Sequence, residues 1–474
     1  MADIKEIIIN TTEKQLINAD LANNFKIIPK EFEENIASFF INEEKNLSLV
    51  QEELELIIGK SVHLIPVSTE LIEKALSTYY RIGDEHNQQT NSIESNKSSS
   101  NDFLEKLIFE AKSIGSSDIH FEVFKEEARI RYRIDGKLIE KYTVKKDNYL
   151  ELVNKIKIKS NLDITEKRLP QDGRINYDDF DIRVSILPTL HGEKIVMRIL
   201  GRDTSHLIVD KLGMEEREKS LYLESLKASK GIILISGPTG SGKTTTLYAS
   251  LKLLNKITNN IVTVEDPIEY TLKGINQVQL REDIGLTFAS ALKTFLRQDP
   301  DIIMLGEIRD AATAEMAIRA SLTGHLVLST IHTNSAMGTI SRLIDMGVPS
   351  FLIAETLKIS VAQRLVRKLC ESCKKKSILE KKQYSNASLD KIVNHWISVG
   401  CSKCYFTGYK GRTAIYETVP IDSDLAQKIK SNSEKLEEHK EENKYYSSLS
   451  EKALQLITDG ITSIEEVYSI IIEG

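Results

Sequence analysis

The stretch "IILISGPTGSGKTTTLYASLKLL", residues 232–254, joins an apolar run, a glycine-rich loop and a helix-forming segment. Glycines in such a loop let backbone N–H groups close around phosphate oxygens, and the following helix adds the positive end of its dipole. Lys243 is expected to reach the β- and γ-phosphates, and the hydroxyl of Thr244 to hold Mg²⁺. A chance glycine-rich turn would not explain this order of strand, loop and helix. The predicted nucleotide-binding residues are Gly237, Pro238, Thr239, Gly240, Ser241, Gly242, Lys243, Thr244 and Thr245.

Short apolar runs separated by helical stretches surround this loop. They read "GIILISG", "NIVTVED", "DIIMLGE" and "HLVLSTI". Continuous apolar strands that alternate with helices indicate a mostly parallel sheet covered on both faces. The sequence therefore predicts an α/β domain with a phosphate-binding loop over residues 207–474.

The first half of the chain has a different pattern. Residues 86–101 are almost entirely polar and predict a flexible linker. After it, an amphipathic helix and alternating segments, two of them joined through Asp135–Gly136, predict an α+β domain with an antiparallel sheet over 102–206. Residues 1–85 predict a small N-terminal domain, with short helices at 29–40 and 68–83.

The net charge and the lengths of the apolar runs indicate which partners and which cellular location to expect. The formal net charge is −6, so no global positive field attracts nucleic acid, and no stable nucleic-acid partner is expected. The N-terminus lacks a basic segment followed by an apolar one, and apolar runs of about 18 residues are absent from the sequence. We expect a cytoplasmic chain.

Acidic residues end two of the predicted strands. "VTVEDPIEY" (262–270) contains Glu265 where the strand stops, and "DIIMLGEIRD" (301–310) stops on Gly306 and Glu307. Ligands of such sheets bind at the carboxyl ends of the strands, so these acids are expected to face the nucleotide. A proline turn alone would not explain acids on both sides of Pro267. His332 follows a third strand, where a histidine is equally often a polar core residue.

The four cysteines form two pairs with metal-ligand spacing: Cys370 and Cys373, then Cys401 and Cys404. Four thiolates can close a tetrahedral structural Zn²⁺ site, although residues 374–400 between the pairs exceed the usual separation of about 15–20. A redox pair would not explain two pairs in tandem. We predict a tetracysteine metal subdomain at about 365–410.

These motifs together resemble the secretion ATPase superfamily, specifically type II secretion and type IV pilus assembly ATPases. The resemblance rests on "GPTGSGKTTTLY", "VTVEDPIEY", "LRQDPDIIMLGEIRD" and "GHLVLSTIHT", which are similar to the Walker A, Asp box, Walker B and His box of the family. It continues through "SDIHFE", "RLPQDGRI", "RVSILPTLHGEKIVMRIL", the cysteine pairs and "TGYKGRTAIYE", and covers about residues 102–470. Residues 1–85 resemble a shortened, diverged platform-docking domain of the family.

The resemblance implies a RecA-like ATPase domain, ATP as substrate and a homohexameric motor. It also implies assembly, rather than retraction, of a filament, through an inner-membrane platform protein and a docking protein that hold the chain at the membrane. Glu265 is implied as the better candidate for polarising the attacking water and Glu307 for ordering a magnesium-bound water. The sequence leaves these two roles exchangeable.

Arginines are the implied source of positive charge for the γ-phosphate. Arg174 and Arg183 match arginines that the family brings from the second domain, and Arg297 matches one of the motor domain. Lys293 stands where relatives often have arginine; it keeps the charge but loses the planar two-pronged donor. With His332, Glu265 and Glu307, these arginines are the predicted catalytic residues.

Two other classes of protein share parts of this pattern. A nucleic-acid translocase on a RecA-like ring has the same loop, but its basic channel or stacking aromatics are disfavoured by the net charge and by an aromatic content of 6%. A nucleotide-dependent assembly scaffold would bind ATP with negligible turnover. The sequence does not distinguish secretion from pili or from DNA-uptake pili.

Overall fold

The computed structural model describes residues 19–32, 36–43, 47–58, 60–80, 100–201, 207–379, 394–431 and 446–473, with a few isolated positions. The chain divides into two compact units. The larger contains residues 100–398 and 409–474, and most of the smaller lies within residues 1–99. Among the described helices, none is both long enough and apolar enough to cross a membrane.

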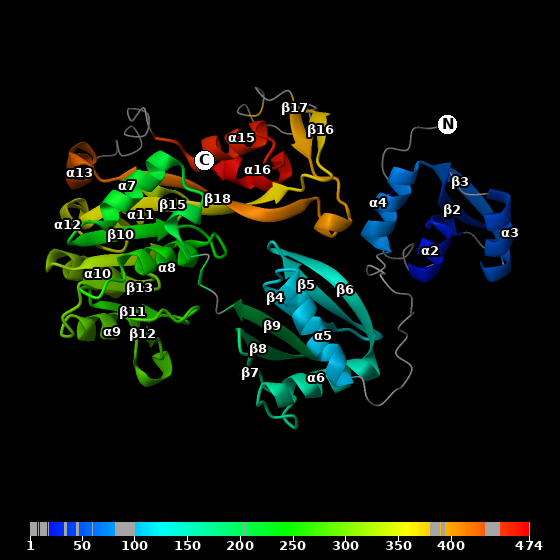
Figure 1. Ribbon diagram of the computed structural model, residues 1–474, viewed down its shortest axis with the longest axis horizontal. Helices are drawn as coiled ribbons and strands as arrows, with labels where there is room; N and C mark the ends of the chain where they lie inside the picture. Colours follow the sequence, from blue (N-terminus) through cyan, green and yellow to red (C-terminus); the bar gives the residue numbers. More distant parts are fainter. Residues whose placement is uncertain are drawn as a thin grey trace. The chain divides into compact units, whose positions relative to one another are not determined.

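A seven-stranded sheet forms the centre of the second half of the chain (Figure 1). Its strand order is β12-β11-β13-β14-β10-β15-β18. The first six strands pair in parallel, and β18 pairs antiparallel with β15. The four apolar runs predicted as strands are β10, β11, β13 and β14, so the parallel α/β prediction is confirmed. The strands are β10 (Gly231–Ser236), β11 (Ile261–Glu265), β12 (Asn276–Gln279), β13 (Ile302–Leu305), β14 (Leu326–Ile331), β15 (Leu357–Leu369) and β18 (Tyr409–Pro420).

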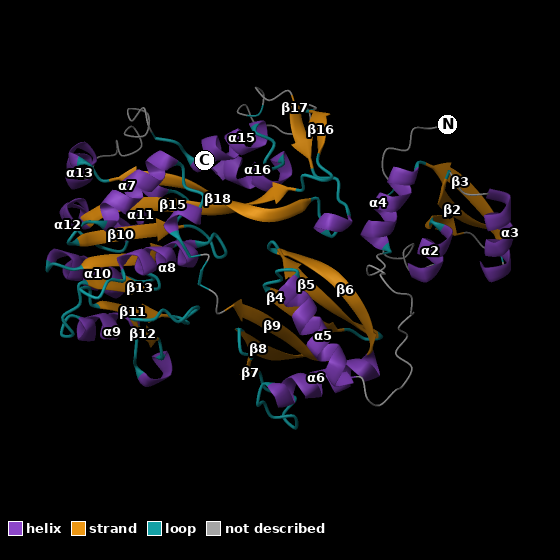
Figure 2. Ribbon diagram, viewed as in Figure 1, coloured by secondary structure: helices purple, strands orange, loops and turns teal. Residues whose placement is uncertain are grey.

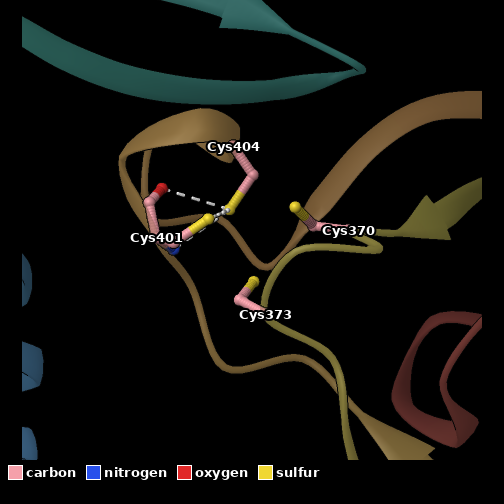
Figure 3. A group of neighbouring side chains, drawn as sticks. All are labelled: Cys370, Cys373, Cys401 and Cys404. Carbon is pink, nitrogen blue, oxygen red and sulfur yellow. Dashed lines mark hydrogen bonds between the residues drawn. The ribbon is translucent and has the colours of Figure 1, made fainter.

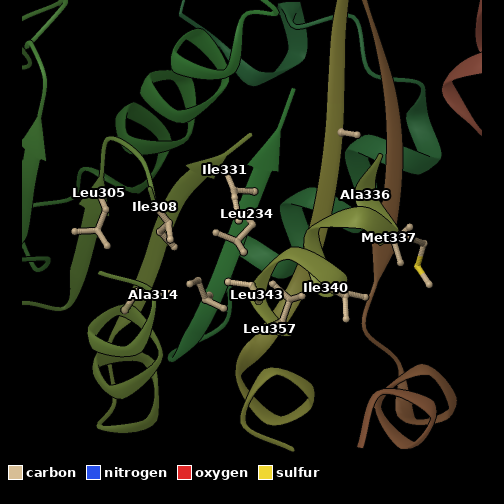
Figure 4. Packing of buried hydrophobic residues seen from close by; sticks show 14 of the residues in the cluster. Leu234, Leu305, Ile308, Ala314, Ile331, Ala336, Met337, Ile340, Leu343 and Leu357 are labelled. Carbon is tan, nitrogen blue, oxygen red and sulfur yellow. The ribbon is translucent and has the colours of Figure 1, made fainter. Parts of the chain in front are cut away.

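Helices cover both faces of this sheet (Figure 2). Side chains along β10 alternate between two cores, because successive residues of a strand point to opposite faces. Ile232 and Leu234 belong to the core that includes α10 and α11, part of which Figure 4 shows. Ile233 and Ile235 belong to a second core with α7 and α8. The helices are α7 (Glu216–Leu226), α8 (Lys243–Leu254), α9 (Phe288–Phe295), α10 (Ala311–Leu322), α11 (Ala336–Asp345), α12 (Ser350–Thr356), α13 (Ser423–Lys430), α15 (Leu449–Thr458) and α16 (Ile464–Glu473).

A six-stranded sheet with the order β6-β5-β4-β9-β8-β7 precedes this domain. Every neighbouring pair is antiparallel, as the alternating pattern predicts. Asp135 and Gly136 both have positive φ, as the tight hairpin turn between β5 and β6 requires. The sequence pattern did not predict β7 or α6. The elements are α5 (Ser100–Ser113), β4 (Asp118–Val123), β5 (Glu127–Ile134), β6 (Lys137–Lys145), α6 (Lys146–Lys159), β7 (Gln171–Asn176), β8 (Phe180–Thr189) and β9 (Gly192–Gly201).

The N-terminal residues form a small three-stranded sheet in the order β1-β2-β3. The helix predicted at 29–40 is wrong, because two strands occupy that stretch. Ala37, Phe39 and Ile41 are fully buried at every second position, and that alternation fits a pleated strand rather than a helix. The helix predicted at 68–83 is confirmed as α4. The elements are α2 (Ala19–Phe25), β1 (Ile27–Phe32), β2 (Ile36–Asn42), α3 (Leu47–Ile58), β3 (Ser61–Val67) and α4 (Thr69–Tyr79).

The predicted linker at 86–101 lies outside the described residues except for its last two positions, which begin α5. The first residues of the chain lie outside them as well.

Candidate active site

The glycine loop follows β10 and packs against β15. A Cβ atom at Gly237 would lie 2.5 Å from the carbonyl oxygen of Gln363, and one at Gly242 would lie 2.8 Å from Nε2 of the same residue. Both glycines also have positive φ, 145° and 88°, a conformation that side chains rarely adopt. Contact with β15 therefore requires glycine at both positions, and it holds the loop backbone in one shape.

Lys243 is the first residue of α8 and points back into the loop. Its Nζ donates to the carbonyl oxygens of Gly237 at 2.7 Å and Pro238 at 3.0 Å. Burial lowers the pKa of Lys243; the charge of Glu307 acts in the opposite direction, and the charge of Arg364 adds to the lowering. Glu307, which follows β13, is therefore an electrostatic neighbour of this ammonium group.

Two hydroxyl groups of the loop suit an anionic ligand with a cation. Ser241 Oγ is buried and has no hydrogen-bond partner among the described residues. Thr244, in the first turn of α8, is exposed. A buried hydroxyl beside the glycines that has no protein partner can donate a hydrogen bond to a phosphate oxygen. The oxygen of an exposed threonine hydroxyl can serve as a ligand of Mg²⁺.

Glu265 ends β11 and is 3% exposed. Its carboxylate accepts three hydrogen bonds: from the hydroxyl of Tyr248, from Thr263 Oγ1 at 2.5 Å and from Gln277 Nε2 at 3.0 Å. A carboxylate has about four lone-pair positions, so one acceptor position of Glu265 is left over. The side chain is held in a single orientation.

Glu307 follows β13 and is more accessible than Glu265. Arg309 Nη2 donates to its Oε1 at 2.5 Å, and His332 Nε2 lies 3.1 Å from its Oε2. Burial alone would raise the pKa of Glu307, but the hydrogen bond and charge of Arg309, with smaller effects from His332, lower it below its usual value. Glu307 is therefore an ionised carboxylate at neutral pH, and the structure brings it together with His332.

The three predicted arginines have different surroundings. Arg183 on β8 donates from Nη2 to the carbonyl oxygen of Ile268 at 2.5 Å, and its Nη1 lies 3.8 Å from the Glu269 carboxylate. Arg174 on β7 is exposed and lies directly opposite Arg183 in the sheet. Arg297, also exposed, donates to the carbonyl oxygen of Lys293 at 3.3 Å. Only Arg183 has a described contact with the loop that follows Glu265.

Sequence reasoning missed three residues that shape this site: Tyr248, Arg309 and Gln363. Gln363 also accepts a hydrogen bond from Thr246 Oγ1 at 2.8 Å. It is an uncharged polar residue inside the apolar strand "KISVAQRLV", and such a residue is a usable signal because buried polar groups need partners. For Tyr248 no sequence signal exists, since an apolar ring on a buried helix face explains it equally well.

The four cysteines come together, as Figure 3 shows. In the chain, Cys373 precedes and Cys401 follows a hairpin of β16 (Lys375–Ile378) and β17 (Asn394–Ile397). Their sulfur atoms all lie within 4.8 Å of one another, and none of the four forms a disulfide. Cys401 Sγ and Cys404 Sγ are 3.8 Å apart. A tetrahedral zinc–thiolate site with Zn–S bonds of about 2.3 Å requires sulfur separations of about 3.8 Å. The cysteines fit a structural metal.

Comparisons with known proteins agree with this geometry. The family model described as "Type II/IV secretion system protein" matches residues 94–469. Type II secretion system protein E of Pseudomonas aeruginosa is 44% identical over 373 residues, covering 77% of this chain and 74% of that protein. The type IV pilus assembly ATPase PilB of Myxococcus xanthus is 40% identical over 447 residues, covering 88% and 79%.

Solved structures show the same fold. A crystal structure of the pilus retraction motor PilT with bound ADP aligns with a TM-score of 0.55 at 26% identity, covering 77% of this chain and 96% of that one. The ATPase DotB of Yersinia pseudotuberculosis aligns with a TM-score of 0.61 at 20% identity, covering 83% and 99%. The chain therefore belongs to the type II/IV secretion system protein family and is an ATPase of its type II secretion and type IV pilus assembly members.

Proposed function

We propose that Glu307 orients the water that attacks the γ-phosphate and that Glu265 orders a magnesium-bound water. The observation that carries this assignment is the difference between the two carboxylates. Glu265 is surrounded by three hydrogen-bond donors and keeps one acceptor position. Glu307 is partly accessible, and its charge raises the pKa of Lys243. The assignment exchanges the roles that the family resemblance favours.

Positive charge for the reaction comes from side chains of both domains in this proposal. Lys243 neutralises charge on the phosphates, and Arg183 and Arg174 supply charge from the antiparallel sheet as the bond breaks. Thr244 would hold magnesium, which would supply further positive charge at the phosphates. Arg297, whose described contact is with the carbonyl oxygen of Lys293, would be a fourth source of charge, for the nucleotide of a neighbouring subunit in the ring.

Hydrolysis then powers filament assembly. The relatives are named for type II secretion and for type IV pilus assembly, and their names support a motor that extends a pseudopilus or pilus. We infer a homohexamer that works on the cytoplasmic side of the inner membrane, where a platform protein and a docking protein hold it. The tetracysteine cluster holds one structural Zn²⁺ in this proposal, because its donor set is four thiols at the required separation.

ATP hydrolysis by purified variants tests the assignment of the two glutamates. Glu307→Gln keeps the shape of the side chain but not its charge, so kcat should fall by about 10²-fold or more while ATP still binds. Glu265→Gln should instead raise the Mg²⁺ concentration needed for half-maximal rate. Lys243→Ala should lose ATP binding.

Glu315→Gln is the matched control, because this exposed glutamate on α10 pairs only with Arg319 in the described contacts. Its kcat should equal that of the parent. A Glu307→Gln enzyme with parental kcat would refute the assignment of the water-orienting role, and the same variant in the source organism should assemble no filament.

A further inference from the structure

The hydroxyl group of Tyr248 connects the phosphate-loop helix to the segment that follows Glu265. Tyr248 lies on α8 and is fully buried. Its hydroxyl donates to Glu265 Oε2 and accepts from the backbone N–H groups of Glu269 at 3.2 Å and Tyr270 at 3.4 Å. A phenol has one donor hydrogen and two acceptor positions, so all of its hydrogen-bonding capacity is used here.

The direction of these bonds follows from the state of the phenol. Burial raises the pKa of Tyr248, and the charge and hydrogen bond of Glu265 raise it further. The hydroxyl therefore keeps its proton at every working pH and remains the donor toward the carboxylate. The ring also packs edge-on against Tyr270, with centroids 5.6 Å apart, which limits its movement.

Arg183 holds the same segment, residues 266–270, from the antiparallel sheet. Its guanidinium donates to the carbonyl oxygen of Ile268 and lies near the carboxylate of Glu269. The backbone of this segment is thus bonded on one side to an arginine of the second domain and on the other to Tyr248. Two side chains join the segment to the carboxylate of Glu265: the hydroxyl of Tyr248, and the amide of Gln277, whose Nε2 lies 3.0 Å from both Glu265 Oε1 and the carbonyl oxygen of Tyr270.

We propose that Tyr248 is a positioning residue that couples segment 266–270, and through it Arg183, to the carboxylate of Glu265. Movement of the segment moves the two N–H groups that orient the hydroxyl, and the hydroxyl sets the position of Glu265 Oε2. Contact with the second domain is in this way communicated to the acid at the end of β11. The inference rests on the proposed function of Glu265 and Arg183 in ATP hydrolysis.

Kinetics of Tyr248→Phe test the positioning role. Phenylalanine keeps the ring and its packing but removes the hydroxyl, so kcat should fall about tenfold with little change in the KM for ATP, because the phosphate loop is intact. Tyr222→Phe is the matched control: Tyr222 is also fully buried in the same core, and its hydroxyl bonds Ser250 of α8 at 2.7 Å instead of Glu265. The control should keep the parental kcat.

Amide hydrogen exchange without nucleotide tests the contact independently of turnover. The amides of Glu269 and Tyr270 should exchange at least about tenfold faster in Tyr248→Phe than in the parent and Tyr222→Phe. A double-mutant cycle with Arg183→Ala should show losses in kcat that are less than multiplicative. Parental kcat, unchanged exchange at both amides, or fully multiplicative losses would each overturn the proposal. An inactive parent with altered exchange in Tyr248→Phe would instead refute hydrolysis itself.

Discussion

At the scale of single residues, the charge state of Glu307 depends on Arg309. Arg309 Nη2 bonds Glu307 and also lies 3.3 Å from Asp266 Oδ2, so one guanidinium links the acids that follow β13 and β11. Burial would favour a neutral Glu307, and the arginine reverses that preference. The water-orienting role proposed for Glu307 requires an ionised carboxylate, and the ion pair with Arg309 favours that state.

Removal of Arg309 should change the pH dependence of hydrolysis. In the parent, the lowered pKa of Glu307 keeps it ionised above that pKa, and activity is lost as the pH falls through it. In Arg309→Ala burial is opposed only by the smaller effect of His332, so the pKa of Glu307 rises and the acid limb of kcat/KM against pH moves to higher pH. Arg319→Ala, which removes the partner of the exposed Glu315, should leave that limb in place. Coincident acid limbs for Arg309→Ala and the parent would contradict the prediction.

At the scale of elements, β15 connects the nucleotide loop to the cysteine cluster. Gln363 of this strand lies against the glycine loop, and Cys370 directly follows its last residue. Arg367 fixes the strand between them: its guanidinium donates to Glu466 of α16 and lies 3.9 Å above the ring of Tyr409 on β18. The cluster is therefore attached to the main sheet through a well-anchored strand.

Loss of the thiols should remove both metal and stability. Purified protein should carry about one zinc per chain, and Cys370→Ser with Cys373→Ser should lower the zinc content and the Tm, since a structural site contributes folding energy. Elemental analysis and thermal unfolding measure the two effects. Ser402→Ala, next to the cluster but without a thiol, is the control that should keep its zinc. Freshly purified, reduced protein without zinc would rule out the metal site.

At the scale of the whole molecule, described contacts join the two sheets of the larger unit at two places. Arg183 reaches the segment after Glu265. At the other place, Asp135 in the β5–β6 turn accepts from the backbone N–H of Gly411 at 2.8 Å and lies 3.7 Å from Arg412 Nε. Both contacts are polar and small, so they can break and re-form during a cycle of nucleotide binding and release.

Arg183→Ala and Arg174→Ala should each lower kcat by at least about tenfold, because arginines of this kind contribute 10³–10⁵ in other phosphoryl-transfer enzymes. ATP affinity should fall much less, since Lys243 and the glycine loop remain. Arg198→Ala is the control: Arg198 lies opposite Arg183 on β9 but bonds Asp118 at 3.0 Å. Steady-state kinetics and nucleotide binding on the oligomeric preparation measure both quantities. Parental kcat in both variants would exclude the antiparallel sheet from catalysis.

The sequence by itself determined the elements whose signal is local. The glycine loop, the four apolar strands around it and the alternating strands of the second domain are read from residues within a short window. The same holds for the cysteine pairs, whose spacing predicts one cluster. Where local signals compete, as at residues 29–40, the spacing of apolar residues predicts a helix, whereas two strands form.

Only the tertiary structure decided how the acids differ. Glu265 ends one apolar strand and Glu307 follows another, and each has one partner two residues away in the chain, Thr263 and Arg309 respectively. The rest of their difference comes from distant partners: Tyr248 and Gln277 close in one carboxylate, while His332 contacts the other. The physical reason is that the order of strands in the sheet determines which distant side chains can bond each acid and how deeply the acid is buried. Local sequence patterns predict single strands but not their order in the sheet.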